Sequence, residues 1–232
     1  MRSSAARSRL DAMVEEIELT LVSIIQGVAL TVLIENSHAI ITQLNFIYWP
    51  YVLAGLLVIF VFWSRAVLHI ITLIRWPLEF GHNFLYIGCA LFEAITFAQI
   101  TKPANWFGFG ALFFAAGWVL FFYDLRLIRD RQRDSAGPAG NRLYERVRRD
   151  QWLNLGLLLP GVFILNTICA VCIRSWPELF VDREVHVWLI AIQIISFAAY
   201  LLYVVRFYVD LAPLIADAHR EWDNVMDNRD QS

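Results

Sequence analysis

Six apolar segments, each close to the length of a membrane-spanning helix, follow one another along this chain. A helix needs about 20 apolar residues to cross the hydrocarbon core of a bilayer. Hydrophobic residues make up 59% of the 232 residues, more than in a typical soluble domain, and no segment alternates apolar and polar residues as a strand does. We therefore predict an all-α polytopic membrane protein, a single domain over residues 1–232 with transmembrane helices at 18–34, 50–74, 83–100, 106–127, 152–173 and 186–209.

Basic residues are concentrated on one side of this layout. The loops on the opposite side hold only Lys102, Arg174 and Arg183, whereas the polar linker 129–150 is rich in arginine. Lys and Arg are enriched in the cytoplasmic loops of multi-pass proteins, and an even number of spans keeps the two termini together. We therefore predict that both termini and the linker are cytoplasmic. The expected location is a cell membrane, with a bacterial inner membrane favoured.

The first span has a polar side. At about 100° per residue, its small and polar side chains fall within one arc of the helix, and two large apolar side chains interrupt that arc. Such a stripe either packs against neighbouring helices or lines a pore, in which case bulky apolar residues form a gate that excludes water. The candidate pore-lining residues are Thr20, Ser23, Gln26, Gly27 and Thr31, and the candidate hydrophobic gate is Leu30 and Ile34.

The segment YVLAGLLVIFVFWSRAVLHIITLI (51–74) places Phe62 and Trp63 before a polar, histidine-containing end. This pattern resembles the second helix of the TMEM175-like (DUF1211) potassium channel family. The order of parts is similar over nearly the whole chain, with six spans, a semi-polar first helix and a basic linker between spans four and five. The family's Phe-Ser-Asp signature in the first helix is not intact, because TLVSIIQG (20–27) has Ile24 in place of the aspartate.

The resemblance implies a homo-oligomeric cation channel, with potassium as the candidate ion, whose pore is lined by first helices from several subunits. A tetramer is favoured, and the partners would be monovalent cations and membrane lipid. The resemblance also implies an inner network around Trp63, Arg65 and His69. The alternative is a non-conducting anchor or sensor that binds partners or anionic lipid through the arginine-rich linker. The acidic residues of that linker argue against nucleic-acid binding.

Ionisable residues inside spans usually have a partner or a function. Glu93 lies in the middle of the third span, where it is either a proton or cation site or a buried carboxyl bonded to a hydroxyl such as that of Thr96. Arg65 either extends to the interface or pairs with Asp124 or Asp210.

His69, one turn after Arg65, is either a pH-sensitive element of a gate or a structural residue. An intramembrane enzyme that uses His69 and Glu93 is the weakest hypothesis, because no motif places the two at catalytic distance. We therefore predict no enzymatic activity, no cofactor and no metal site. Finally, Pro160-Gly161 predicts a kink in the fifth span.

Overall fold

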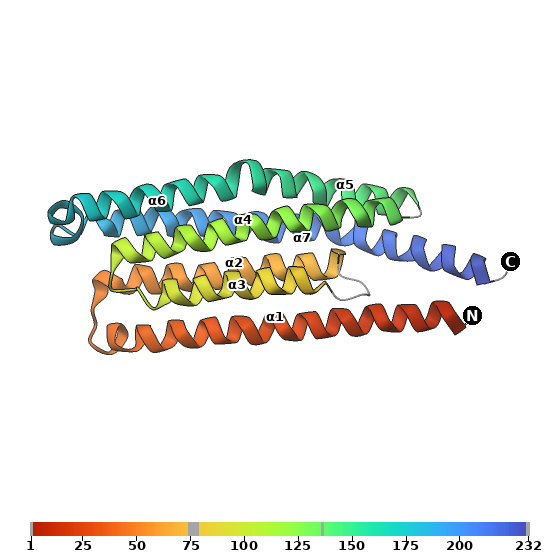
Figure 1. The fold of residues 1–232 in the computed structure, drawn as a ribbon, viewed down its shortest axis with the longest axis horizontal. Coiled ribbons are helices and arrows are strands. Elements are labelled where there is room, and N and C mark those ends of the chain that lie inside the picture. The colour runs from red at the N-terminus through yellow and green to blue at the C-terminus, as the bar shows by residue number, and fades with distance from the viewer. Residues whose placement is uncertain (1, 74–78, 136, 231–232) are drawn as a thin grey trace.

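The computed structural model describes residues 2–73, 79–135 and 137–230, and this part of the chain is helical with no strand (Figure 1). Short turns link the helices, with a 3₁₀ turn at Phe46–Tyr48 and π-helical turns at Asn154–Leu158 and Glu178–Asp182. The α-helices are α1 (Arg2–Thr42), α2 (Trp49–Leu73), α3 (Phe80–Phe97), α4 (Pro103–Asp134), α5 (Pro138–Leu153), α6 (Leu159–Ser175) and α7 (His186–Asp230).

The helices form an antiparallel bundle in which α5 and α6 run on from one another as a single bent rod (Figure 1). The two ends of the chain lie at the same end of the bundle. Five segments are long and apolar enough to cross a membrane, namely Ala12–Thr42, Phe46–Leu73, Pro103–Arg133, Pro138–Ser175 and His186–Ala218. The prediction of an all-α fold is confirmed, and these five segments support a multi-pass membrane protein.

The third predicted span is helical but is not among these five segments. It corresponds to α3, which has 18 residues and carries His82, Asn83 and Glu93. All three polar side chains are buried against the neighbouring helices. A sixth span and a cytoplasmic location for both termini therefore stay predictions.

The helices extend beyond the predicted apolar segments. The basic linker 129–150 is not an irregular loop, because α4 continues to Asp134 and α5 begins at Pro138, which leaves only a short break between them. The π-helical turn Asn154–Leu158 ends two residues before Pro160, where the sequence predicts a kink. Proline removes a backbone donor and crowds the preceding turn, and a π turn accommodates both effects.

Close helix packing places α1 against α2 and α3, and α2 in turn against α7. Gly55 of α2 lies at a close contact with α1 and α3, since a Cβ atom there would lie 2.8 Å from Cδ1 of Leu33 and 3.2 Å from Cε1 of Phe97. Small residues allow this approach between membrane helices. The result is a tightly packed interior in which polar residues of α1, α2, α3 and α4 are held in fixed positions.

Candidate functional site

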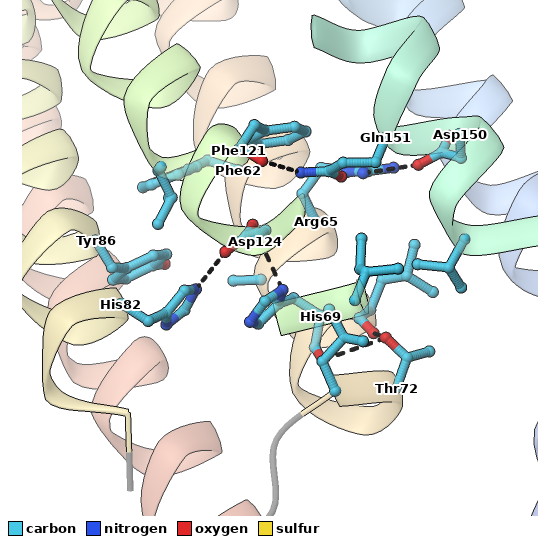
Figure 2. Close-up of a pocket in the computed structure, with 16 residues that line it drawn as sticks. Phe62, Arg65, His69, Thr72, His82, Tyr86, Phe121, Asp124, Asp150 and Gln151 are labelled. Carbon is cyan, nitrogen blue, oxygen red and sulfur yellow. Dashed lines mark hydrogen bonds and ion pairs between the residues drawn. The ribbon is translucent and has the colours of Figure 1, made fainter. Parts of the chain in front are cut away.

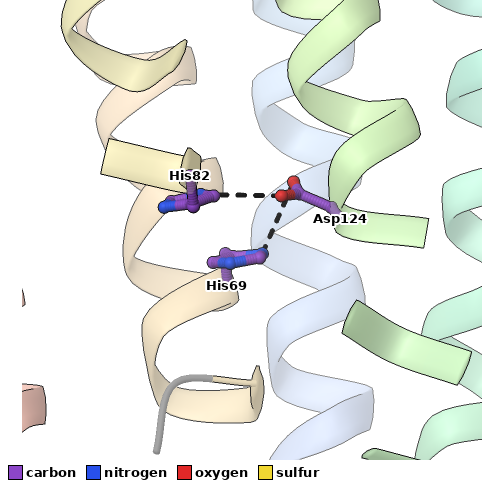
Figure 3. Close-up of side chains that lie close together, drawn as sticks. All are labelled: His69, His82 and Asp124. Carbon is purple, nitrogen blue, oxygen red and sulfur yellow. Dashed lines mark ion pairs between the residues drawn. The ribbon is translucent and has the colours of Figure 1, made fainter. Parts of the chain in front are cut away.

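Two histidines and an aspartate from three different helices meet inside the bundle. His69 comes from α2, His82 from α3 and Asp124 from α4, and all three are buried (Figure 3). His69 Nδ1 lies 3.4 Å from Asp124 Oδ2, and His82 Nε2 lies 3.6 Å from Asp124 Oδ1. One ligand-competent atom from each residue lies within 4.8 Å of the other two. The three side chains are therefore close enough together to be candidate ligands of one ion.

The two imidazole rings are stacked. Their centroids are 4.2 Å apart and their planes differ by 4°. Both rings direct a nitrogen toward the same carboxylate (Figure 3). Two imidazolium rings in this contact would repel each other strongly in a medium of low dielectric constant. The arrangement therefore favours rings that are not both protonated.

A chain of hydrogen bonds from α1 fixes the orientation of His82. Asn83 Nδ2 donates to Glu18 Oε1 at 2.7 Å, which turns the amide oxygen of Asn83 toward His82. His82 Nδ1 lies 3.4 Å from that oxygen. Because an amide oxygen only accepts hydrogen bonds, His82 Nδ1 carries the proton in this contact.

The same assignment leaves two acceptors facing each other. With the proton on Nδ1, a neutral His82 presents the lone pair of Nε2 to Asp124 Oδ1, 3.6 Å away. Asp124 Oδ1 has no hydrogen-bond partner, and neither does His69 Nε2. Buried polar atoms are normally paired. A cation between His82 Nε2 and Asp124 Oδ1, either a proton or a metal ion, would pair both of these atoms.

The space beside these residues suits a small occupant. The His–Asp site opens onto a cavity of about 30 Å³, whose lining includes Tyr86, Thr72 and Gln151 (Figure 2). A cavity of about 10–15 Å³ on this measure is enough for one water molecule. The cavity can therefore hold an ion or a few waters but not an organic substrate.

Arg65 forms a second buried cluster next to the His–Asp site. Its Nη2 lies 2.8 Å from Asp150 Oδ2, and its guanidinium group lies over the ring of Phe121 (Figure 2). Tyr203 donates to the other carboxylate oxygen of Asp150 at 2.7 Å. The predicted pairing of Arg65 with Asp124 or Asp210 is wrong, because its partner is Asp150 of α5. The side chain of Arg65 is only 10% exposed.

Glu93 belongs to a third polar group, deeper along the bundle. Gln26 Nε2 lies 3.2 Å from both Glu93 Oε2 and Tyr86 Oη. The alternative partner considered for Glu93, the Thr96 hydroxyl, instead donates to the backbone oxygen of Phe92. The carboxyl of Glu93 is thus buried and held by an amide from α1.

Most of the predicted pore-lining stripe lies on the outer surface of α1. Gln26 is the exception, because it is buried against α3. Thr20, Ser23 and Thr31 are exposed and donate to backbone oxygens of their own helix. The remaining positions, Gly27, Leu30 and Ile34, are also exposed. A pore along this stripe therefore requires a second copy of the chain.

The predicted inner network is only partly assembled. Arg65 and His69 line the same cavity, but Trp63 is 40% exposed and faces away from it. The sequence interpretation did not single out His82, Asn83 or Asp150. The available signal was the presence of polar residues beside an apolar segment, at 82–83 and at the start of the fifth span.

No family model matches this chain. No curated protein and no solved structure is detectably similar to it either. The resemblance to TMEM175-like channels therefore stays a prediction, and the function is argued from the geometry of the site.

Proposed function

We propose that this protein is a multi-pass membrane protein that binds a divalent transition-metal ion inside its helix bundle, at His69, His82 and Asp124. The observation that carries the proposal is the contact of His82 Nε2 with Asp124 Oδ1, a buried oxygen that has no hydrogen-bond partner among the described residues. A metal ion pairs both atoms and leaves the stacked imidazoles neutral, whereas protonation of both rings would place two charges 4.2 Å apart.

The ligand set favours zinc or iron(II). Imidazole nitrogen suits zinc, copper, iron and nickel, and two histidines with one carboxylate form the ligand set of many iron(II) sites. Metal–ligand bonds of about 2.0–2.2 Å place ligand atoms about 3.3 Å apart in a tetrahedral site. The His69 Nδ1–Asp124 Oδ2 distance of 3.4 Å already matches this spacing.

The residues around the His–Asp site favour a divalent ion. Metal-bound histidines usually donate their second nitrogen to a carbonyl or carboxylate group, and His82 does so through Asn83 to Glu18. With an ion bound and both carboxyls ionised, Glu18 and Asp124 would together balance two positive charges. Arg65 adds no net charge to this region because Asp150 pairs with it.

Metal content of the full chain in lipid nanodiscs tests the proposal. After removal of metals with a chelator, the protein is dialysed against Zn²⁺ or, without oxygen, Fe²⁺, and the bound metal is measured by mass spectrometry. We expect one ion per chain, and we expect Asp124→Asn and His82→Gln to lose it. The control is His186→Gln, because His186 is also buried but contacts Tyr51 Oη at 2.9 Å, outside the site.

Two results would overturn the proposal. One is a parent protein that binds neither metal. The other is an Asp124→Asn variant that retains the metal content of the parent. Circular dichroism and elution volume show whether each variant is folded, and His69→Gln provides a further variant at the same site.

A second candidate function is the homo-oligomeric cation channel, and the observation that favours it is the exposed stripe on α1. Leu30 and Ile34 lie on that stripe with 37% and 59% of their surface exposed. Six spans with both termini in the cytoplasm, and a location in a bacterial inner membrane, are part of this proposal. The alternative is a non-conducting anchor or sensor that uses the helical basic segments around the α4–α5 break.

Potassium flux into liposomes tests the channel. We expect the parent to conduct and Ile34→Asn to raise the flux, because a polar residue at a hydrophobic gate favours water. Val28→Asn is a matched control, since Val28 is also 59% exposed but lies off the stripe. The anchor or sensor is favoured if neither the parent nor Ile34→Asn conducts under any condition. It is also favoured if Ile34→Asn and Val28→Asn give equal flux.

A further inference from the structure

A second, larger cavity lies beside the His–Asp site and is almost wholly apolar. Its volume is about 310 Å³, and its walls come from α2, α4, the first π turn, α6 and α7. Cavities that bind small organic molecules span roughly 300–1,000 Å³ and combine apolar walls with a few polar groups. This cavity therefore has the size for part of an organic ligand.

Aromatic rings make up much of the wall. Aromatic side chains pack well against the flat face of another ring. They come from three helices, with Phe62 on α2, Phe113, Phe114 and Phe121 on α4, and Phe197 on α7. The lining therefore suits a planar, apolar ring.

The π-helical turn between α5 and α6 forms another part of the wall. Asn154, Leu157 and Leu158 of this turn all line the cavity. A π turn inserts an extra residue into a helix and widens it locally, and such turns occur frequently at functional sites. The cavity thus lies beside the π-helical turn that separates α5 from α6.

Arg65 is the charged residue of the cavity, whose lining also includes the polar residues Asn154, Ser196 and Tyr200. Phe62, Arg65 and Phe121 line both the apolar cavity and the small cavity beside His69. The side chain of Arg65 is only 10% exposed, and its Nε and Nη1 atoms have no hydrogen-bond partner. Two buried donors are therefore available to an acceptor on a ligand.

The pairing of Arg65 with Asp150 decides what kind of acceptor fits. Asp150 Oδ2 already neutralises the guanidinium group at 2.8 Å. A second carboxylate would add an uncompensated buried charge, whereas a neutral carbonyl oxygen would only complete the hydrogen bonds. Arg65 also lies about 12 Å along α2 from its end at Leu73, within the apolar segment Phe46–Leu73.

We propose that this cavity binds the ring of an isoprenoid quinone. Such a molecule combines a neutral ring, carbonyl acceptors and an apolar tail within the bilayer. One ring carbonyl accepts a hydrogen bond from Arg65, the ring packs against the phenylalanines, and the tail extends into lipid. This proposal is independent of metal binding at His69, His82 and Asp124.

Binding of decylubiquinone to the full chain in nanodiscs tests the proposal. Gly117→Leu fills the cavity, because Gly117 lines it and a Cβ atom there would lie 3.9 Å from Leu159 Cδ2, an ordinary contact. We expect this variant to bind the quinone at least about tenfold more weakly than the parent. The control is Gly88→Leu, since Gly88 also has open space at its Cβ but does not line the cavity.

A double variant tests the polar contact. Arg65→Gln combined with Asp150→Asn removes the guanidinium donors while leaving no buried charge, and we expect about tenfold weaker binding. Oleate and a phospholipid serve as competing ligands. Preferential binding of either over the quinone, or unchanged quinone affinity in Gly117→Leu, would overturn the proposal.

Discussion

His69 and His82 stack face to face at a centroid distance of 4.2 Å, although they come from different helices. Their inward nitrogens lie 3.4 and 3.6 Å from opposite oxygens of Asp124. The carboxylate thus spans the edges of two rings that cannot both be charged without mutual repulsion. One cation shared by all three groups resolves this conflict.

The orientation of His82 depends on Asn83, which we regard as a positioning residue. Asn83→Leu removes both the donor to Glu18 and the acceptor for His82 Nδ1. Loss of such an outer contact typically lowers metal affinity by about 10–100-fold. Competition with a chromophoric chelator for Zn²⁺ measures this change. Asn105→Leu is the control, since Asn105 contacts Gln99 and Arg174 instead, and equal affinity in the two variants would contradict the assigned role.

The Arg65–Asp150 pair joins α2 to α5. Removal of one partner should lower the free energy of unfolding more than neutral replacement of both partners. Arg65→Met leaves Asp150 buried without its cation, and we expect the free energy of unfolding to fall by about 3–5 kcal/mol. The double variant Arg65→Met with Asp150→Asn should recover most of this loss. Equilibrium unfolding in mixed micelles measures both. Arg220→Met removes an exposed ion pair with Asp217 and should change the free energy of unfolding little. The expectation is refuted if the double variant is destabilised by the sum of the losses of the two single variants.

Gln26 should be more important for stability than its exposed neighbours on α1. Gln26→Leu removes the donor to Glu93 and the contact with Tyr86, and each buried polar group left unpaired costs about 1–3 kcal/mol. Ser23→Ala should cost little, because the Ser23 hydroxyl is exposed and bonds its own helix. The same unfolding experiment compares the two variants. A similar stability for both would show that the Gln26 contacts contribute nothing.

The close approach of α1 and α2 at Gly55 predicts a packing defect in a larger variant. Gly55→Val forces Leu33 and Phe97 to move, and we expect the free energy of unfolding to fall by about 1–3 kcal/mol. Gly27→Val is the matched control, because a Cβ atom at Gly27 meets nothing within 4 Å. Equal stability of the two variants would show that the interface adapts without cost.

The apolar segments were sufficient to predict the apolar helices of the bundle but not α5, because each apolar segment must satisfy its backbone internally in lipid. Trp49–Leu73 agrees with the predicted second span to within one residue at each end. The helix wheel also located the polar side of α1. It could not show which residues of that side face the bundle, and Gln26, at the edge of the stripe, proved to be buried.

The candidate site could not be predicted in the same way. His69 was singled out as an isolated residue, but its neighbours His82 and Asp124 belong to other helices, and the rotation of one helix against another is set by packing. Arg65 illustrates the same limit. The helix wheel gives the direction of the Arg65 side chain but not its partner. Its partner is Asp150, which lies on α5, in a segment that was expected to be a linker but is helical.

The polar contacts of α1 also impose an order on membrane insertion. Glu18 and Gln26 belong to the helix that is synthesised first, yet their partners Asn83 and Glu93 belong to α3. Until α3 has been synthesised, these contacts cannot form. Complete burial of Glu18 and Gln26 as paired groups therefore has to follow the synthesis of α3.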